Sequence, residues 1–269
     1  MYHSGKELKK VIVSPPEREY FNVENLREHN FKEIPDRERA INQHAELRKH
    51  LKKCGVEVIE VKELSGHPNS VFTMDTAVSL NDGYIKLRMG LASRRGEDEW
   101  MAGILENLGL EKLGEIKAPG TAEGGDITVA YPYAFIGYSE RTNKEGIIQL
   151  EKIFKDLGYE SRIMRIPSQY LHLGGIMTFI GEERVLACEN GILEKEKLKG
   201  LEVFWIRCGG VVTANVIYTG GEKIICRMRN YEAQKLLIKE GYEVYPLDLS
   251  EFTKGSGGPT CLILPLERK

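Results

Sequence analysis

The sequence lacks long apolar stretches and concentrated positive charge. It contains no run of about 18 consecutive apolar residues, the length needed to cross a membrane. The N-terminal stretch MYHSGKELKK has no apolar core of the kind found in a secretory signal. The 38 Lys and Arg residues are balanced by 40 Asp and Glu residues, so the net charge is −2. We therefore expect a soluble, cytoplasmic protein that binds neither membranes nor nucleic acid.

Cysteine is also scarce, and its spacing suggests no pairing. The five cysteines are an odd number, lie far apart and include no CxxC pair. This pattern predicts neither a disulfide framework nor a structural zinc site. Structural roles are expected for four of them: Cys54, Cys188, Cys208 and Cys226.

Strand-like and helix-like segments alternate along the chain, and no segment is typical of a linker. Hairpin signals such as the Asn-Asp-Gly at 81–83 separate pairs of apolar runs. A hairpin, a helix and a further strand recur at intervals of roughly 40–60 residues, which is typical of a ring or an array. We therefore predict an α/β fold in which ββαβ modules form a ring, with residues 1–269 as one domain. The expected helices are at 36–54, 97–108, 142–157 and 231–240.

The fifth cysteine, Cys261, follows the segment GSGGPT close to the C-terminus. Gly, Ser and Pro cannot sustain a helix or a central strand, so residues 255–260 are predicted to form a loop. Such a loop would hold the thiol at the mouth of a cavity, where a nucleophile belongs. The alternative is that Cys261 is a small apolar residue at the start of a C-terminal strand.

Polar residues interrupt the apolar pattern near strand ends in several of the repeats. Taken singly, each has a structural explanation, such as a capped turn, an exposed loop residue, a surface charge or a hydrogen-bonded core histidine. Together they favour a polar site at the centre of the ring, because about one such place occurs in each repeat. These residues are Asn69 and Asp75 around Phe72, Glu123 and Asp126 around two glycines, Arg141, and His172 between two leucines.

The combination of a thiol, an imidazole and carboxylates restricts the chemistry. Cysteine with histidine supplies a nucleophile and its acid–base partner. Nearby carboxylates would raise the pKa of the thiol, which argues against a protease that acts on a neutral peptide. The same carboxylates suit a planar guanidinium, which they can bind in bidentate geometry. We therefore expect Cys261 to attack a guanidinium carbon, with ammonia or an alkylamine leaving and with the bound cation lowering the pKa of the thiol.

Seven motifs extend this pattern, within a match that runs from about residue 12 to residue 266 and so covers almost the whole chain. In order they are PNSVFTMD, SRRGE, APGTAEGGDI, IGYSERTN, LHLGG, TAN and GGPTC. Together they closely resemble the dimethylarginine dimethylaminohydrolase branch of the guanidino-group-modifying enzymes, a superfamily that also includes arginine deiminases and amidinotransferases. The resemblance implies the pentein fold, in which five ββαβ-like units surround a pseudo-five-fold axis and the active site lies in the central channel. It implies a small guanidino substrate, arginine or methylarginine, with no cofactor and no metal, and it is compatible with a homodimer.

The resemblance also implies a role for each matching residue. Cys261 corresponds to the nucleophile, and His172 corresponds to the general acid that protonates the leaving amine and then activates water. Glu123, counted among the catalytic residues, and Asp75 correspond to the carboxylates that hold the guanidinium. The other expected substrate-binding residues are Asn69 at the amino-acid end of the substrate, Phe72, Arg94 and Arg141 on the α-carboxylate, and Asp126 in a supporting role.

Three departures from the family pattern leave the substrate open. Met74 stands before Asp75, where the dimethylaminohydrolases tend to have an acidic residue. His172 is not followed by the Asp of the deiminase HxD pattern, and Asn69 resembles the PN motif of deiminases. Hydrolysis to citrulline is the main hypothesis. The alternatives are an arginine dihydrolase that releases ornithine, ammonia and carbon dioxide, an amidinotransferase, and a ring without activity that only binds arginine.

The segment YFNVENLREHNF, residues 20–31, is expected to form part of a lid over the channel. Asn22 and Asn25 in this lid could touch the substrate. The resemblance gives neither residue a role.

Overall fold

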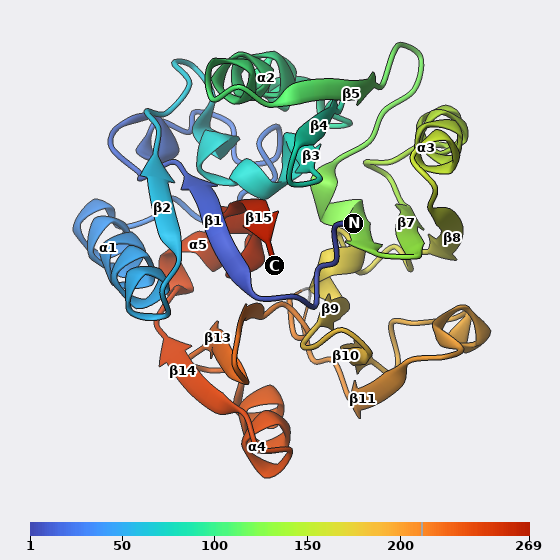
Figure 1. Cartoon of the computed structure of the whole chain (residues 1–269). Helices are drawn as coiled ribbons and strands as arrows, with labels where there is room; N and C mark the ends of the chain where they lie inside the picture. The colour runs from blue at the N-terminus through green and yellow to red at the C-terminus, as the bar shows by residue number, and fades with distance from the viewer. Residues whose placement is uncertain (211) are drawn as a thin grey trace.

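Five three-stranded sheets form a ring in the computed structural model, which describes residues 1–210 and 212–269 (Figure 1). Each sheet has an inner strand, a middle strand antiparallel to it, and an outer strand parallel to the middle one. The longer helices lie around the outside of the ring (Figure 1). The predicted ring of ββαβ modules is therefore confirmed.

Four modules follow one another along the chain, each in the order inner strand, middle strand, helix and outer strand. The first module contains β3 (Ala77–Ser79), β4 (Gly83–Lys86), α2 (Glu97–Asn107) and β5 (Glu111–Glu115), and the second contains β6 (Ile127–Ala130), β7 (Tyr133–Tyr138), α3 (Lys144–Asp156) and β8 (Glu160–Arg165). The third module contains β9 (Met177–Phe179), β10 (Arg184–Cys188), the 3₁₀ helix η7 (Lys195–Leu198) and β11 (Glu202–Ile206). The fourth contains β12 (Ile217–Gly220), β13 (Lys223–Arg227), α4 (Tyr231–Lys239) and β14 (Glu243–Leu247).

The fifth module combines the two ends of the chain. Its strands and helix are β1 (Leu8–Val13), α1 (Arg37–Lys53), β2 (Glu57–Glu60) and the inner strand β15 (Leu264–Arg268), which the short helix α5 (Ser250–Lys254) precedes. β15 runs antiparallel to β1, with Ile12 opposite Leu264. β2 runs parallel to β1, with Ile12 opposite Ile59. The pairing of β15 with β1 thus closes the ring.

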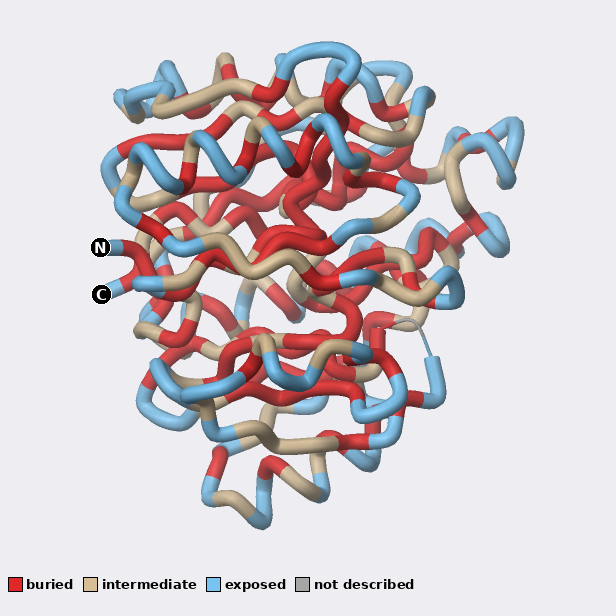
Figure 2. The backbone as a smooth tube through the Cα atoms, turned by 90° about the vertical axis from the view of Figure 1, so that its right-hand side faces the viewer, coloured by how far each residue is buried: buried red, intermediate tan, exposed pale blue. Residues whose placement is uncertain are grey.

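The two ends of the chain lie on one face of the ring. Figure 1 looks onto this face, with both termini near the centre, and Figure 2 shows the same face from the side. Because β15 ends on this face, the residues that precede it lie deeper in the channel or beyond it. The two mouths of the channel are therefore built from different parts of each module.

Apolar side chains fill the space between each sheet and its helix. In α3 the residues at helical spacing, Ile147, Leu150 and Phe154, are buried against the sheet that contains β7 and β8. Helix α1 begins after Asp36, whose side chain accepts a hydrogen bond from the Arg39 amide at 2.8 Å, as expected of an N-cap. All four predicted helices are present with ends within about two residues of those expected.

Three elements differ from the sequence-based expectations. The third module has no α-helix among the described residues and uses the short η7 instead. The outer strands β5 and β11 were not predicted, because they are short and mostly exposed or half-buried, which leaves no clear apolar alternation.

One pair of cysteines also departs from expectation. Cys188, at the end of β10, forms a disulfide with Cys208, just beyond β11, with the two Cα atoms 5.4 Å apart. The strands β10 and β11 are paired in parallel and bring these residues together although they are 20 positions apart. Their wide spacing in the sequence therefore concealed the contact.

No helix within the described part of the chain is long and apolar enough to span a membrane.

Candidate active site

The central site is built from equivalent positions in the modules. In four modules a short 3₁₀ turn precedes the inner strand: η3 (Thr73–Asp75), η5 (Gly124–Asp126), η6 (Leu173–Gly175) and η8 (Thr260–Leu262). Asp75 ends η3, Glu123 and His172 are the N-cap residues of η5 and η6, and Cys261 lies inside η8. The pseudo-symmetry of the ring therefore brings a carboxylate, a second carboxylate, an imidazole and a thiol to its axis.

The two glycines of the EGGD motif allow these turns to approach closely. A Cβ atom on Gly124 would lie 2.0 Å from the carbonyl oxygen of Met74. A Cβ atom on Gly125 would lie 2.7 Å from Oδ1 of Asp75 and 2.6 Å from Nδ1 of His172. In the absence of a side chain, the Gly125 amide donates a hydrogen bond to Oδ1 of Asp75 at 3.0 Å. Larger residues would push the site apart.

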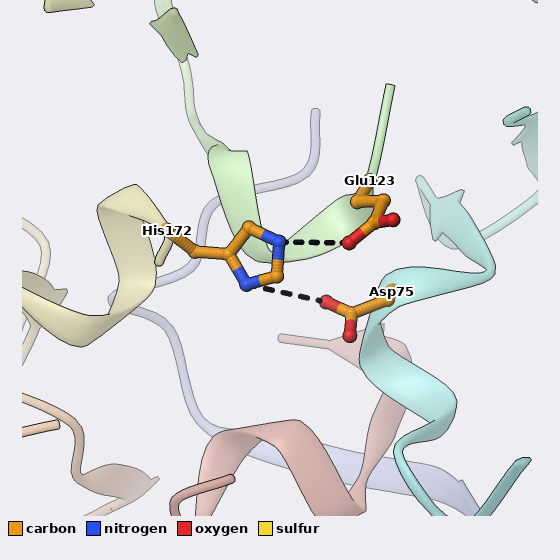
Figure 3. A group of neighbouring side chains, drawn as sticks. All are labelled: Asp75, Glu123 and His172. Carbon is orange, nitrogen blue, oxygen red and sulfur yellow. Dashed lines mark hydrogen bonds and ion pairs between the residues drawn. The ribbon is translucent and has the colours of Figure 1, made fainter. Parts of the chain in front are cut away.

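His172 lies between two carboxylates (Figure 3). Its Nε2 is 2.9 Å from Oε2 of Glu123, and its Nδ1 is 3.9 Å from Oδ1 of Asp75. Burial favours the neutral imidazole, but the negative charges of Asp75, Asp126 and Glu123 outweigh it and raise the pKa of His172 to about 9. The imidazole is therefore protonated at neutral pH and can act as a general acid.

Glu123 is fully buried and held by several donors. Its Oε1 accepts hydrogen bonds from the amides of Gly90 and Leu91 at 3.0 and 3.1 Å. Nη1 of Arg141 lies 3.1 Å from Oε2 of Glu123. Burial opposes ionisation, but Arg141 and His172 outweigh it and hold the pKa of Glu123 well below its usual range. The carboxylate is therefore charged and fixed in place.

Arg94 lies between two carboxylates behind the site. Its Nη1 contacts Oδ2 of Asp75 at 2.5 Å, and its Nη2 contacts Oε2 of Glu97 at 2.7 Å. Its Nη2 also donates to the backbone oxygen of Phe72 at 3.1 Å. Burial raises the pKa of Glu97 to about 7, against the opposing effect of Arg94, and Oε1 of Glu97 has no hydrogen-bond partner. Glu97 was missed in the sequence, although it ends the SRRGE motif and stands three positions after Arg94.

Asp126 connects the site to the loop after β7. One of its carboxylate oxygens accepts hydrogen bonds from the hydroxyls of Ser139 and Thr142 at 2.5 and 2.8 Å. The other accepts a hydrogen bond from the amide of Leu173 at 3.1 Å, next to His172. Both oxygens are thus occupied by protein donors, which fits the supporting role implied by the sequence.

Cys261 lies beside Asp75 at the end of the Gly-rich loop. The amide of Gly258 donates a hydrogen bond to its Sγ at 3.3 Å. Burial and the negative charge of Asp75 raise the pKa of the Cys261 thiol to about 12, although the Gly258 amide and Arg94 oppose this. The raised pKa favours the neutral thiol at Cys261 over the thiolate at neutral pH.

Most of the residues predicted to form the site line one narrow pocket. Its free volume is about 20 Å³, and its lining includes Asn69, Phe72, Asp75, Arg94, Arg141, His172 and Cys261. Glu123 and Asp126 lie behind this wall. The ring of Phe72 packs so closely on Gly257 that an added Cβ would lie 2.2 Å from it.

The lid contributes a different asparagine from those proposed in the sequence. Asn22 and Asn25 are exposed and do not line the pocket, whereas Asn30 does. The backbone oxygen of Asn30 accepts a hydrogen bond from Ser256 at 3.0 Å. That of His29 accepts one from Nδ2 of Asn69 at 3.0 Å. The lid is thus tied down from both sides of the pocket.

Asn215 occupies the fifth equivalent position, in the turn before β12. Its Oδ1 accepts a hydrogen bond from the amide of Thr260 at 2.9 Å, and its Nδ2 lies 4.0 Å from Sγ of Cys261. It therefore orients the turn that carries Cys261. Asn215 belongs to the TAN motif, but no role was predicted for it.

Asp75, Glu123 and His172 also have the composition of a metal site. One ligand atom from each lies within 4.8 Å of the others. Asp75 is already paired with Arg94, and Glu123 with Arg141, so a divalent cation would have to compete with both guanidinium groups. The arrangement fits an organic cation that donates hydrogen bonds better than a metal ion.

Comparisons with known proteins agree with this geometry. The family model for N,N dimethylarginine dimethylhydrolase, eukaryotic, matches residues 19–203. The chain is 31% identical to an uncharacterised protein of Aeropyrum pernix over 85% of this chain and 84% of the other. It is 29% identical to N(G),N(G)-dimethylarginine dimethylaminohydrolase of Pseudomonas aeruginosa, over 86% of this chain and 89% of that enzyme. A cysteine-to-serine mutant of the Pseudomonas aeruginosa enzyme in complex with citrulline superposes with a TM-score of 0.83 at 27% identity, covering 96% and 99% of the two chains.

The ring fold and its central thiol, imidazole and carboxylates define a guanidino-group-modifying enzyme that hydrolyses carbon–nitrogen bonds in amidines. The length of the match and its level of identity make the family assignment specific. The chain belongs to the dimethylarginine dimethylaminohydrolase family.

The close approach at Gly125 predicts the effect of adding one methyl group. Gly125→Ala should displace His172 or Asp75 and reduce turnover by about 100-fold or more, because small displacements of catalytic groups are costly. Gly103→Ala is the matched control, since nothing lies within 4 Å of a Cβ atom at this helical position. It should leave turnover unchanged and stabilise the fold by up to about 1 kcal/mol. Equal activity of the two variants would contradict the described packing.

The contact between Glu123 and His172 predicts a change in titration. In Glu123→Gln, the pKa of His172 should fall from about 9 towards its ordinary value of 6.5, because the neutral amide stabilises the imidazolium less. The raised pKa contributes stability that is fully present below pH 6.5 and is lost as the pH rises through about 9. An NMR titration of the His172 ring measures the change, with the exposed Glu151→Gln as control. An unchanged His172 pKa would show that Glu123 does not hold the proton.

Proposed function

We propose that this protein hydrolyses the guanidinium group of arginine or N-methylated arginine through a covalent intermediate on Cys261. The products are citrulline and either ammonia or an alkylamine. The observation that carries the proposal is the placement of Cys261, Asp75 and His172 around one pocket. Burial and the charge of Asp75 raise the pKa of the Cys261 thiol, and the nearby carboxylates raise the pKa of His172. Such a thiol is a poor nucleophile until a cation is bound next to it.

A bound guanidinium supplies this cation. Its N–H groups pair with the carboxylate of Asp75, which lines the pocket, and its positive charge offsets the effect of Asp75 on the thiol. Glu123 lies behind the wall and acts through its contact with His172. The pKa of Cys261 therefore falls when the substrate is in place, and the thiolate forms next to the guanidinium carbon as its proton leaves to solvent. A neutral amide substrate would provide no such effect.

The reaction then proceeds in two balanced steps. The Cys261 thiolate forms a bond to the guanidinium carbon, and the bond to the terminal nitrogen breaks as His172 transfers its proton to the leaving amine. Neutral His172 next removes a proton from water, whose oxygen attacks the same carbon. The carbon–sulfur bond breaks, and the departing thiolate takes the remaining proton from the new citrulline oxygen. Citrulline is released, and the thiol and imidazolium are restored.

Two residues are suited to the amino-acid end of the substrate. Oδ1 of Asn69 is buried without a hydrogen-bond partner, so it can accept a hydrogen bond from the α-ammonium group. Arg141 lines the pocket and uses only Nη1 in the hydrogen bonds recorded between its side chain and the described residues. Its other N–H groups are thus available to the α-carboxylate. Arg94, which donates to Asp75, Glu97 and Phe72, is less available for this role.

The wall beside the leaving amine is suited to methyl groups. A small cavity adjoining Cys261 and His172 has a free volume of about 30 Å³ and is lined in part by Met74, Leu171 and Val212. Methyl groups on the leaving nitrogen would contact apolar surface there. This feature favours N-methylated arginine over arginine, within the few kcal/mol that one or two methyl groups supply.

A product assay tests the proposal. The protein is incubated separately with L-arginine, monomethylarginine, dimethylarginine and agmatine, and the products are identified by mass spectrometry. We expect citrulline from at least one methylated arginine, and little reaction with agmatine because it lacks the carboxylate that Arg141 binds. Cys261→Ser should lose turnover by at least about a thousandfold while still binding the substrate. Cys54→Ser, at the other partly exposed free cysteine, is the matched control and should retain turnover.

Two outcomes would contradict the proposal. Ornithine with ammonia and carbon dioxide would establish two rounds of hydrolysis instead of one. Unchanged turnover in Cys261→Ser would exclude the covalent mechanism. The cytoplasmic location, the homodimer and the single domain stay predictions.

A further inference from the structure

A second cavity lies at the opposite end of the channel, and its lining includes Tyr2, Ser4 and Arg268. Both chain termini lie on this face of the ring (Figure 2). Its volume is about 80 Å³, larger than that of the pocket around Cys261. All five inner strands contribute to its mainly apolar wall. Representative side chains are Ala77, Val129, Met177, Ile217 and Leu264.

A buried arginine, Arg268, lines this cavity. Arg268 as a whole is only 7% exposed. Nη1 donates hydrogen bonds to the backbone oxygens of Lys6 and Tyr218, at 2.7 and 3.1 Å. Nε is buried without a hydrogen-bond partner, and no acceptor for Nη2 is found among the described residues. The guanidinium group is therefore only partly satisfied by the protein.

Arg268 also has no counter-ion within the described part of the chain. Glu182 and Glu222, which lie in the same region, are exposed and form no ion pair with it. The two backbone oxygens offer partial negative charge but no net charge. A buried cation without a paired anion is unfavourable, so the site is complete only when an anion is supplied from outside.

Two hydroxyl groups accompany Arg268 at this end of the cavity. Tyr2 and Ser4 line the cavity together with Arg268. Oγ of Ser4 donates a hydrogen bond to the backbone oxygen of Val129 at 2.8 Å. The cavity thus has one polar, positively charged end and an apolar remainder.

We propose that this cavity binds a short-chain aliphatic monocarboxylate, with the carboxylate on Arg268 and the alkyl chain along the apolar wall. One water needs roughly 10–15 Å³ of such space, so the cavity holds about six heavy atoms, the size of butyrate. The substrate itself does not fit this description, because no carboxylate lines the cavity to receive a second cation. Met74 and Thr260 line this cavity and also the one beside Cys261, so the two sites share a wall.

Calorimetric titration of the intact protein with sodium butyrate tests the site. We expect saturable binding at one site per chain, weaker binding of acetate and no saturable binding of butylamine or 1-butanol. These three probes separate the contributions of the chain and the charge. The readout is independent of turnover, so it does not depend on the function proposed above.

Two variants remove the two halves of the site. Arg268→Met removes the charge, and Thr178→Leu fills the cavity from β9 at a side chain that makes no recorded hydrogen bond with the described residues. Each should weaken butyrate binding by at least about tenfold. Lys269→Met is the matched control for charge, because this neighbouring side chain is exposed and pairs with Glu267. It should bind butyrate as the unmodified protein does.

Any of three results would overturn the proposal. The first is no saturable binding of butyrate to the unmodified protein. The second is unchanged binding in Thr178→Leu, which folds independently of the Arg268 hydrogen bonds and remains informative if Arg268→Met does not fold. The third is equal binding of inorganic phosphate and butyrate, which would show a site for small anions with no role for the alkyl chain.

Discussion

The antiparallel pairing of β15 with β1 is the contact on which the ring and its active site depend. It supplies the inner strand of the fifth module and joins segments from the two ends of the chain. Cys261 lies in the turn just before β15, and this turn packs on the turn that carries Asp75. Cys261 therefore reaches Asp75 and His172 only when the ring is closed. Formation of the active site thus requires contacts of very long sequence separation.

The centre of the closed ring concentrates charge in a buried volume. Arg94 and Arg141 stabilise the carboxylates of Asp75 and Glu123, and these carboxylates in turn keep His172 protonated. The same negative charge suppresses ionisation of Cys261. In the mechanism we propose, this arrangement favours a cationic ligand, whose arrival makes the thiol reactive. The same buried negative charges thus make the site electrostatically unfavourable without a ligand and selective for a cation when one binds.

The repeat of hairpin, helix and strand was visible in the sequence because apolar spacing changes from a period of two to a helical period within each module. The prediction of individual elements failed where that signal was weak, in the outer strands β5 and β11 and in the short η7 of the third module. The site was predictable to the extent that polar residues broke an apolar pattern, as at His172 and Glu123. Residues that act from behind gave no such signal. Glu97 looks like an ordinary first-turn residue of a helix, and the Cys188–Cys208 bond depends on strand pairing.

The most direct test of the covalent account is the mass of the protein trapped in acid during turnover. We expect an adduct confined to the peptide that contains Cys261. Its mass should be the same with arginine and with dimethylarginine whenever both react, because the leaving amine has gone and the rest of the substrate stays bound to sulfur. An adduct on another residue would contradict the account, as would one that retains the methyl groups or carries only the amidino carbon and its nitrogens.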